Sequence, residues 1–240
     1  MRSLFVLVLL LWVGRAEAAP PAVDFSYNES LDGICSLVRG SAIKAAWKAE
    51  LKHDLPDFEQ QWATLGPKLM ATTEKITGKQ FTQKNITAHL TLCDIPSDSF
   101  LGVVVNMRYA LASFTPTPVP LRYKISVLFH EILHKFLNDH MPTQSRLLSE
   151  HQNEGKRVKN HLHLLALEKA VYLELGLTSE LKEIIDIDGQ LPGGAYKRAW
   201  EIVNQTDGEY LKYVDEIRGN SSNFAVKRDA PKAAPPSTLP

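Results

Sequence analysis

The sequence predicts a mainly helical α+β fold with one small β-sheet, antiparallel or mixed. Apolar residues recur at helical spacing over the first third of the chain and again after Pro120. Between these ranges the period changes to the strict alternation of a strand. The 240 residues suffice for one substantial domain. We expect it to occupy residues 19–218, between a leader over 1–18 and a disordered tail over 219–240.

Residues 1–18 have the parts of a secretory signal peptide. Arg2 supplies the positive start, Leu4 to Val13 is an apolar core too short to span a bilayer, and Ala16-Glu17-Ala18 is a small-x-small cleavage site. We therefore expect a secreted or periplasmic protein with no stable membrane span after cleavage. The 27 basic residues balance the 27 acidic ones, so nothing indicates a nucleic-acid partner.

Helices are expected before the sheet. After an extended lead-in over 19–28, apolar positions predict one helix over 30–39 and a second over 41–53. Pro56 is expected to start a third helix that continues to about Thr77, with Phe58 and Trp62 in the core.

The sheet is expected between Lys79 and Ser113. Ile86, Ala88, Leu90 and Leu92 alternate with polar residues and predict a strand. Pro96-Ser97-Asp98 then predicts a turn, and the range 101–113 reads as a second strand, paired with the first as a hairpin.

The segment from Leu128 to His140 reads LFHEILHKFLNDH and holds an HExxH motif. His130 and His134 stand one helical turn apart on one face, so both imidazoles can bind one cation from the same side. Neutral imidazole suits zinc, and two such ligands leave room for a third ligand and a water. Glu131 is placed to take the proton of that water and return it to a leaving amine.

This motif resembles that of the zincin metallopeptidases. Uncharged residues surround it as in that family, although Lys135 departs from the pattern. The resemblance covers the motif helix and extends to the helix after it. It implies a zincin-like core, a Zn²⁺ cofactor and peptide or protein substrates. It also implies a substrate-binding edge strand, for which the second expected strand is the candidate.

The third zinc ligand has several candidates. The long helix expected over 157–175 places His161 and Glu168 on an otherwise apolar face. A carboxylate there needs a partner, and in the gluzincin plan a glutamate of the next helix completes the site, so we favour Glu168. The two residues are about 10 Å apart along the helix, so His161 would then orient a ligand or stabilise the oxyanion.

Other ligands stay open as alternatives. His161 can itself be the ligand. Glu154 belongs to an Asn-Glu-Gly sequence like that of zinc aminopeptidases, and Glu150 lies in the same polar loop over 142–156. His140 has the metzincin spacing, but Leu137 stands where that family has the glycine that permits the turn.

The remaining helices are expected over 179–187 and 196–213. Cys35 and Cys93 can form a disulfide in an oxidising compartment. Two buried thiols are the alternative, and a third option is a zinc ligand at Cys93, similar to the upstream cysteine of peptide deformylases.

These observations lead us to expect an exported zinc metallopeptidase, with His130, His134 and Glu168 as ligands. Hydrolysis would proceed through a zinc-bound water, with Glu131 as general base. The alternatives are a non-catalytic exported protein that binds a metal or a partner, and a zinc hydrolase of a non-peptide amide. A closed four-ligand site would favour a structural role, and an open position would favour catalysis.

Overall fold

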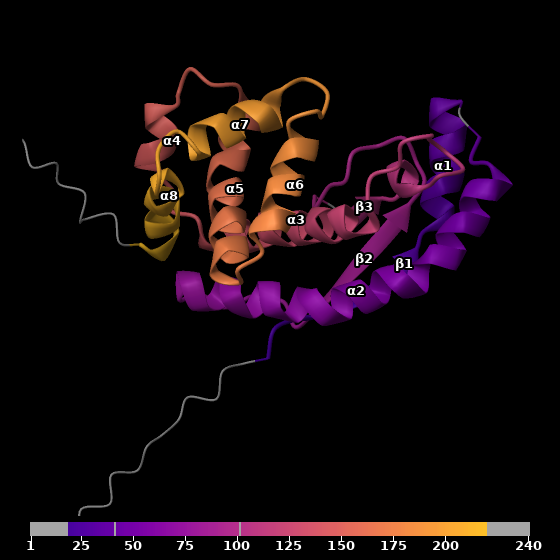
Figure 1. Ribbon diagram of the computed structural model, residues 1–240, viewed down its shortest axis with the longest axis horizontal. Coiled ribbons are helices and arrows are strands. Elements are labelled where there is room, and N and C mark those ends of the chain that lie inside the picture. The colour runs from indigo at the N-terminus through magenta and orange to yellow at the C-terminus, as the bar shows by residue number, and fades with distance from the viewer. Residues whose placement is uncertain (1–18, 41, 101, 220–240) are drawn as a thin grey trace, which may run out of the picture.

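The computed structural model describes residues 19–40, 42–100 and 102–219 (Figure 1). The expected signal peptide and the expected tail from residue 220 lie outside the described residues. The elements follow in this order: β1 (Ala22–Tyr27), α1 (Glu29–Arg39), α2 (Ala45–Thr77), β2 (Asn85–Thr91), β3 (Val103–Asn106), a 3₁₀ turn (Arg108–Ala110), α3 (Leu121–His140), α4 (Arg146–Glu150), α5 (Lys156–Glu174), α6 (Thr178–Asp188), α7 (Ala195–Val203) and α8 (Glu209–Arg218).

The described chain is mostly helical with a small sheet, which confirms the α+β class. The expected hairpin, and with it the antiparallel or mixed sheet, is wrong. β1, β2 and β3 lie side by side in that order, and both pairs are parallel. Alternation of apolar and polar side chains is the same in parallel and antiparallel strands, so it carries no information on direction.

The segment before β3 explains the false hairpin signal. Its Pro-Ser-Asp sequence predicts a turn between two antiparallel strands, but the chain instead crosses to the side of β2 opposite β1. Asp98 then forms an isolated antiparallel bridge with Val104. The backbone bonds of that bridge measure 2.8 and 3.1 Å, and they cover part of the outer edge of β3.

The expected extended lead-in over 19–28 is wrong in one respect, because it contains strand β1. This strand pairs with β2 in the register Ala22↔Asn85 to Tyr27↔Leu90. Phe25 packs edge-to-face on Phe58 of α2, with ring centroids 5.3 Å apart. Val23, Phe25 and Tyr27 alternate with polar residues, so the segment also has the period of a strand, over six residues.

The two helices expected over 41–53 and from Pro56 to about Thr77 are one continuous helix, α2. It runs through Pro56 and Pro67, although each proline removes a backbone hydrogen bond within the helix. Packing on both sides of Pro56 compensates, since the helix buries a row of large side chains: Trp47, Leu51, Phe58, Trp62, Leu69 and Met70. Near the C-terminus, the single helix expected over 196–213 is instead two helices, α7 and α8, which are separated near Gly208.

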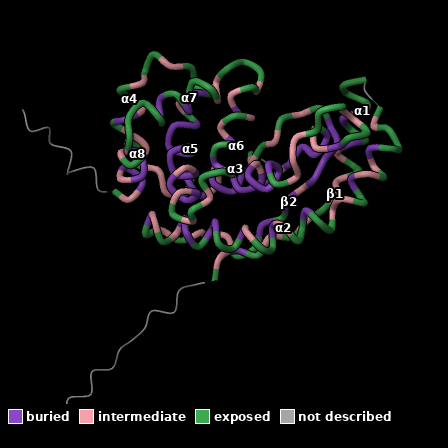
Figure 2. Tube along the Cα trace, in the orientation of Figure 1, coloured by how far each residue is buried: buried purple, intermediate pink, exposed green. Residues whose placement is uncertain are grey.

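Helix α5 lies at the centre of the helical part and packs against α2, α3, α6, α7 and α8. In Figure 1 it stands upright between α8 and α6, and α3 runs across its base. Both α3 and α5 are largely buried, as the purple trace in Figure 2 shows. The contact between these two helices positions the candidate site. Among the described residues, no helix is both long and apolar enough to cross a membrane.

Candidate metal centre

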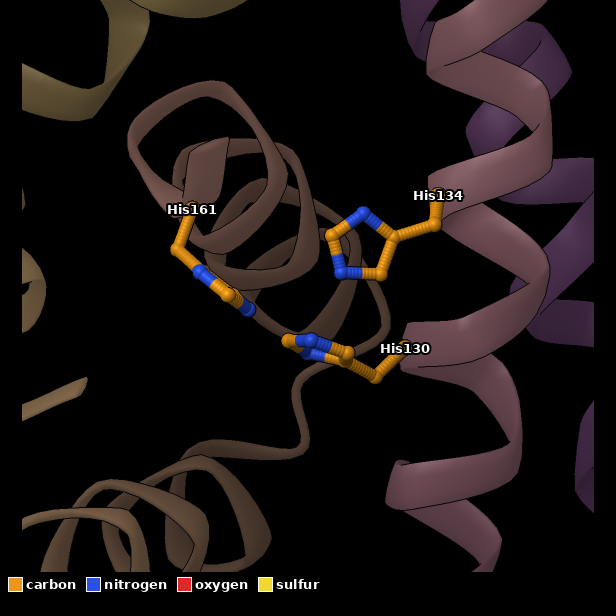
Figure 3. A group of neighbouring side chains, drawn as sticks. All are labelled: His130, His134 and His161. Atoms are coloured by element: carbon orange, nitrogen blue, oxygen red, sulfur yellow. The ribbon is translucent and has the colours of Figure 1, made fainter. Parts of the chain in front are cut away.

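Three histidines from two helices meet at the contact of α3 and α5. His130 and His134 project from successive turns of α3 toward His161 of α5 (Figure 3). One ring nitrogen from each residue can be chosen such that all three lie within 4.8 Å of one another. The ring centroids are 4.9 to 5.2 Å apart. This arrangement brings together the two motif histidines and one of the third-ligand candidates.

Hydrogen bonds on the far sides of two rings orient them. Nδ1 of His161 lies 2.6 Å from the carbonyl oxygen of Arg157, to which it donates as the protonated nitrogen. Nδ1 of His130 lies 3.4 Å from Oε2 of Glu168. Each bond occupies Nδ1 and leaves Nε2 as the nitrogen available to a cation, which is the usual support for a metal-binding histidine.

All three imidazoles are neutral at physiological pH. Burial lowers the pKa of His130 to about 3 and that of His134 to about 3. Burial, together with proximity to His130, lowers the pKa of His161 to about 4. Because a metal binds only the unprotonated nitrogen, these side chains are in the form that binds a metal.

Glu168 lies behind His130 rather than among the clustered nitrogens. Its side chain is fully buried, and burial raises its pKa to about 8. With His130 neutral as well, the contact between the two is a neutral hydrogen bond rather than an ion pair. The sequence correctly indicated that this carboxyl needs a partner, and the partner in the structure is an imidazole.

Glu131 is buried on α3 next to the segment that precedes β3. Burial and the charge of Asp98 raise its pKa to about 8, although a hydrogen bond with Ser99 opposes the shift. A nearby cation would favour the ionised carboxylate, which is the form that accepts a proton.

Tyr196 of α7 is a site residue that the sequence did not reveal. Its hydroxyl lies 3.4 Å from Nε2 of His130, and its ring centroid is 4.5 Å from that of His161. The charge of Glu131 contributes to a raised Tyr196 pKa, after the larger effect of burial, so the phenol keeps its proton. The hydroxyl is therefore a hydrogen-bond donor beside the nitrogen that would hold a metal.

Asp188 of α6 fixes α7 against α3. One carboxylate oxygen accepts from the Tyr123 hydroxyl at 2.7 Å, and the other accepts from the Trp200 indole N–H at 2.8 Å. Tyr123 precedes His130 by two helical turns, and Trp200 follows Tyr196 by one. This buried bridge holds Tyr196 opposite the histidines.

The structure does not bring the other ligand candidates to the cluster. His140 bonds to the carbonyl oxygen of Gln80 at 2.8 Å, and Glu154 pairs with Arg198 at 2.6 Å. Glu150 pairs with Arg146. Cys93 is bonded to Cys35 as a disulfide, which settles the open question of the cysteines. A cavity of about 470 Å³ between β1 and α2 contains none of these candidates.

Comparisons with protein-family models, with curated proteins and with solved structures find no match for this chain.

Proposed function

We propose that this chain is an exported, zinc-dependent hydrolase that cleaves peptide bonds. The observation that carries the proposal is the meeting of the HExxH histidines of α3 with His161 of α5. Three neutral imidazoles, two buried and that of His134 half-buried, form a ligand set typical of zinc. The disulfide between Cys35 and Cys93 is compatible with an oxidising compartment.

The ligand set in this proposal is His130, His134 and His161. Glu168 then acts as the partner that orients His130, the reverse of the roles favoured from the sequence. Three side-chain ligands leave a coordination position for water or substrate, which favours catalysis over a purely structural metal. Bound zinc would polarise the scissile carbonyl and acidify a water molecule.

The protein's own side chains supply the remaining chemistry. Glu131 accepts the proton of the attacking water and returns it to the leaving amine. The Tyr196 hydroxyl donates a hydrogen bond to the oxygen that becomes negatively charged as the carbonyl is attacked. Burial excludes bulk water from His130 and Glu131, which strengthens these interactions.

The substitution Glu131→Gln tests the role of Glu131 as general base. The amide is nearly isosteric but cannot take a proton, so we expect hydrolysis of a peptide library to fall by about two to four orders of magnitude. Zinc content should stay unchanged, because Glu131 is not a ligand. Liquid chromatography with mass spectrometry measures the cleavage products, and elemental analysis measures zinc.

Glu150→Gln is the matched control, since this exposed glutamate pairs only with Arg146 among the described residues. It should retain full activity. Cleavage by Glu131→Gln at the wild-type rate would contradict the mechanism. If wild-type protein bound zinc and cleaved a non-peptide amide but no peptide, the substrate class would be wrong and the site assignment would stand.

A further inference from the structure

Helix α1 presents a row of large apolar side chains to solvent. Ile34, Leu37 and Val38 are 60%, 85% and 77% exposed. Their spacing of three and four residues places them on one face of the helix. Figure 2 shows α1 at one end of the molecule, with much of its trace exposed. Three adjacent exposed aliphatic side chains are typical of an interaction surface.

The opposite face of α1 is fixed to the sheet. Buried Asp32 accepts hydrogen bonds from the Thr91 hydroxyl at 2.6 Å and from the Leu92 N–H at 2.9 Å. The disulfide of Cys35 with Cys93 lies one turn further along the same face. Turning the apolar row inward would break this disulfide and leave a carboxylate without its partners. The exposure therefore follows from the covalent and hydrogen-bonded attachment of the helix.

The charged side chains that follow this row in the chain are positive as far as Ala49, whereas Glu29 precedes the row in the first turn of α1. The sequence from Gly33 to Ala49 contains no aspartate or glutamate and includes Arg39, Lys44 and Lys48. Lys48 approaches Glu29 at 3.8 Å. Arg39 and Lys44 are exposed and form no ion pair within the described residues, although Lys44 lies 5.3 Å from the ring centroid of Trp47. Ala42, Ala45 and Ala46 beside them are also exposed.

We propose that the α1 patch, defined as Ile34, Leu37, Val38, Arg39 and Lys44, docks on the surface of a bilayer that contains anionic lipids. The apolar side chains would enter the boundary between headgroups and acyl chains, and the two cations would pair with anionic headgroups. A two-fold contact with a second copy fits less well, because it would bring the cations of both copies to one interface.

The test is co-sedimentation of the purified protein, its N-terminus verified by mass spectrometry, with vesicles of phosphatidylglycerol or of phosphatidylcholine. We expect binding to the anionic vesicles that weakens with added salt, and little binding to the zwitterionic ones. The triple variant Ile34→Ser, Leu37→Ser, Val38→Ser should bind anionic vesicles about tenfold or more weakly. Arg39→Gln with Lys44→Gln should reduce binding and its salt dependence.

The matched control is Leu211→Ser, which removes an exposed leucine of α8, 43% exposed and outside the patch. It should bind vesicles as the wild type does. Circular dichroism checks that each variant folds, and the mass of the intact protein checks that its disulfide has formed. Absence of vesicle binding by the wild type, or equal binding by the triple variant, would overturn the proposal. A dimer that the triple variant abolishes, without vesicle binding, would assign the patch to a second copy instead.

Discussion

At the residue scale, the support behind His130 determines how well the site can hold a metal. Glu168 is fully buried and reaches only the nitrogen of His130 that points away from the cluster. A metal dication beside His130 would favour the ionised carboxylate, whose charge then strengthens the imidazole as a ligand. The carboxyl would therefore act on a bound metal through the histidine.

This role predicts the effect of Glu168→Gln. The amide keeps the shape and a hydrogen bond but cannot become negative, so zinc affinity should fall by about 10 to 100-fold, with the site still formed. Competition with a chromogenic zinc chelator measures the affinity. Glu174→Gln on the same helix is the control, because its carboxylate is at the surface and pairs with Lys75. Complete loss of zinc in Glu168→Gln would instead indicate that Glu168 is itself a ligand.

The sequence revealed His130, Glu131 and His134 because their spacing along one helix is a local property. It narrowed the third ligand to a few candidates and favoured Glu168, whereas the structure brings His161 to the other two histidines. This choice depends on how α5 is rotated against α3. Tyr196 gave no signal, because its position opposite His130 depends on the packing of a third helix. Residues brought together by tertiary contacts have no fixed spacing in the chain.

At the element scale, the position of α7 depends on one buried carboxylate. Burial raises the pKa of Asp188 to about 7, with the charge of Glu168 adding to the effect. Its two hydrogen bonds join α3 and α7 across α6, so the distance from Tyr196 to His130 is set by a residue outside the site.

Asp188→Ala should therefore impair hydrolysis more than metal binding. It leaves the Tyr123 hydroxyl and the Trp200 N–H unpaired, which costs about 1 to 3 kcal/mol for each group, and it frees α7 to move Tyr196. We expect a lower kcat, near-normal zinc content and partial rescue in Asp188→Asn, which can still bond to both partners. Asp186→Ala, on the exposed face of α6, should change neither quantity. Equal kcat in Asp188→Ala and the wild type would contradict the positioning role.

Elements were predictable where local periodicity sufficed. α1, α5, α6 and β2 appear close to their expected ranges. The continuity of α2 depends on distant contacts, because buried aromatic residues hold both sides of Pro56. β1 has a local signal, the alternation of Val23, Phe25 and Tyr27, but it extends over only six residues. A proline signal alone cannot show that packing compensates for a lost hydrogen bond.

At the scale of the whole molecule, buried carboxyls tie the stability of the metal-free protein to pH. The pKa values of Glu131 and Glu168 in the fold are about 8, above the ordinary glutamate value of 4.5. The folded state therefore binds more protons than the unfolded state between these values. The resulting stability is fully present below pH 4.5 and is lost as the pH rises through 8.

Above pH 7 the clustered histidines are neutral in the folded state and mostly neutral in the unfolded state, so the carboxyls dominate. We predict that the free energy of unfolding of chelator-treated protein decreases between pH 7 and 8 by about 1 kcal/mol or more for each of the two groups. Urea denaturation at several pH values measures the slope. The double variant Glu131→Gln, Glu168→Gln should have a much flatter profile. A wild-type profile that rises over this interval would contradict the burial of these groups as neutral acids.

The central claim is that His130, His134 and His161 together bind zinc. The most direct test is the zinc content of the purified protein after zinc is supplied, measured by elemental analysis beside His161→Ala and the matched control His140→Ala. We predict about one zinc per chain in the wild type and in His140→Ala, and little in His161→Ala. A wild type without zinc, or a His161→Ala variant that binds it as tightly as the wild type, would contradict the claim.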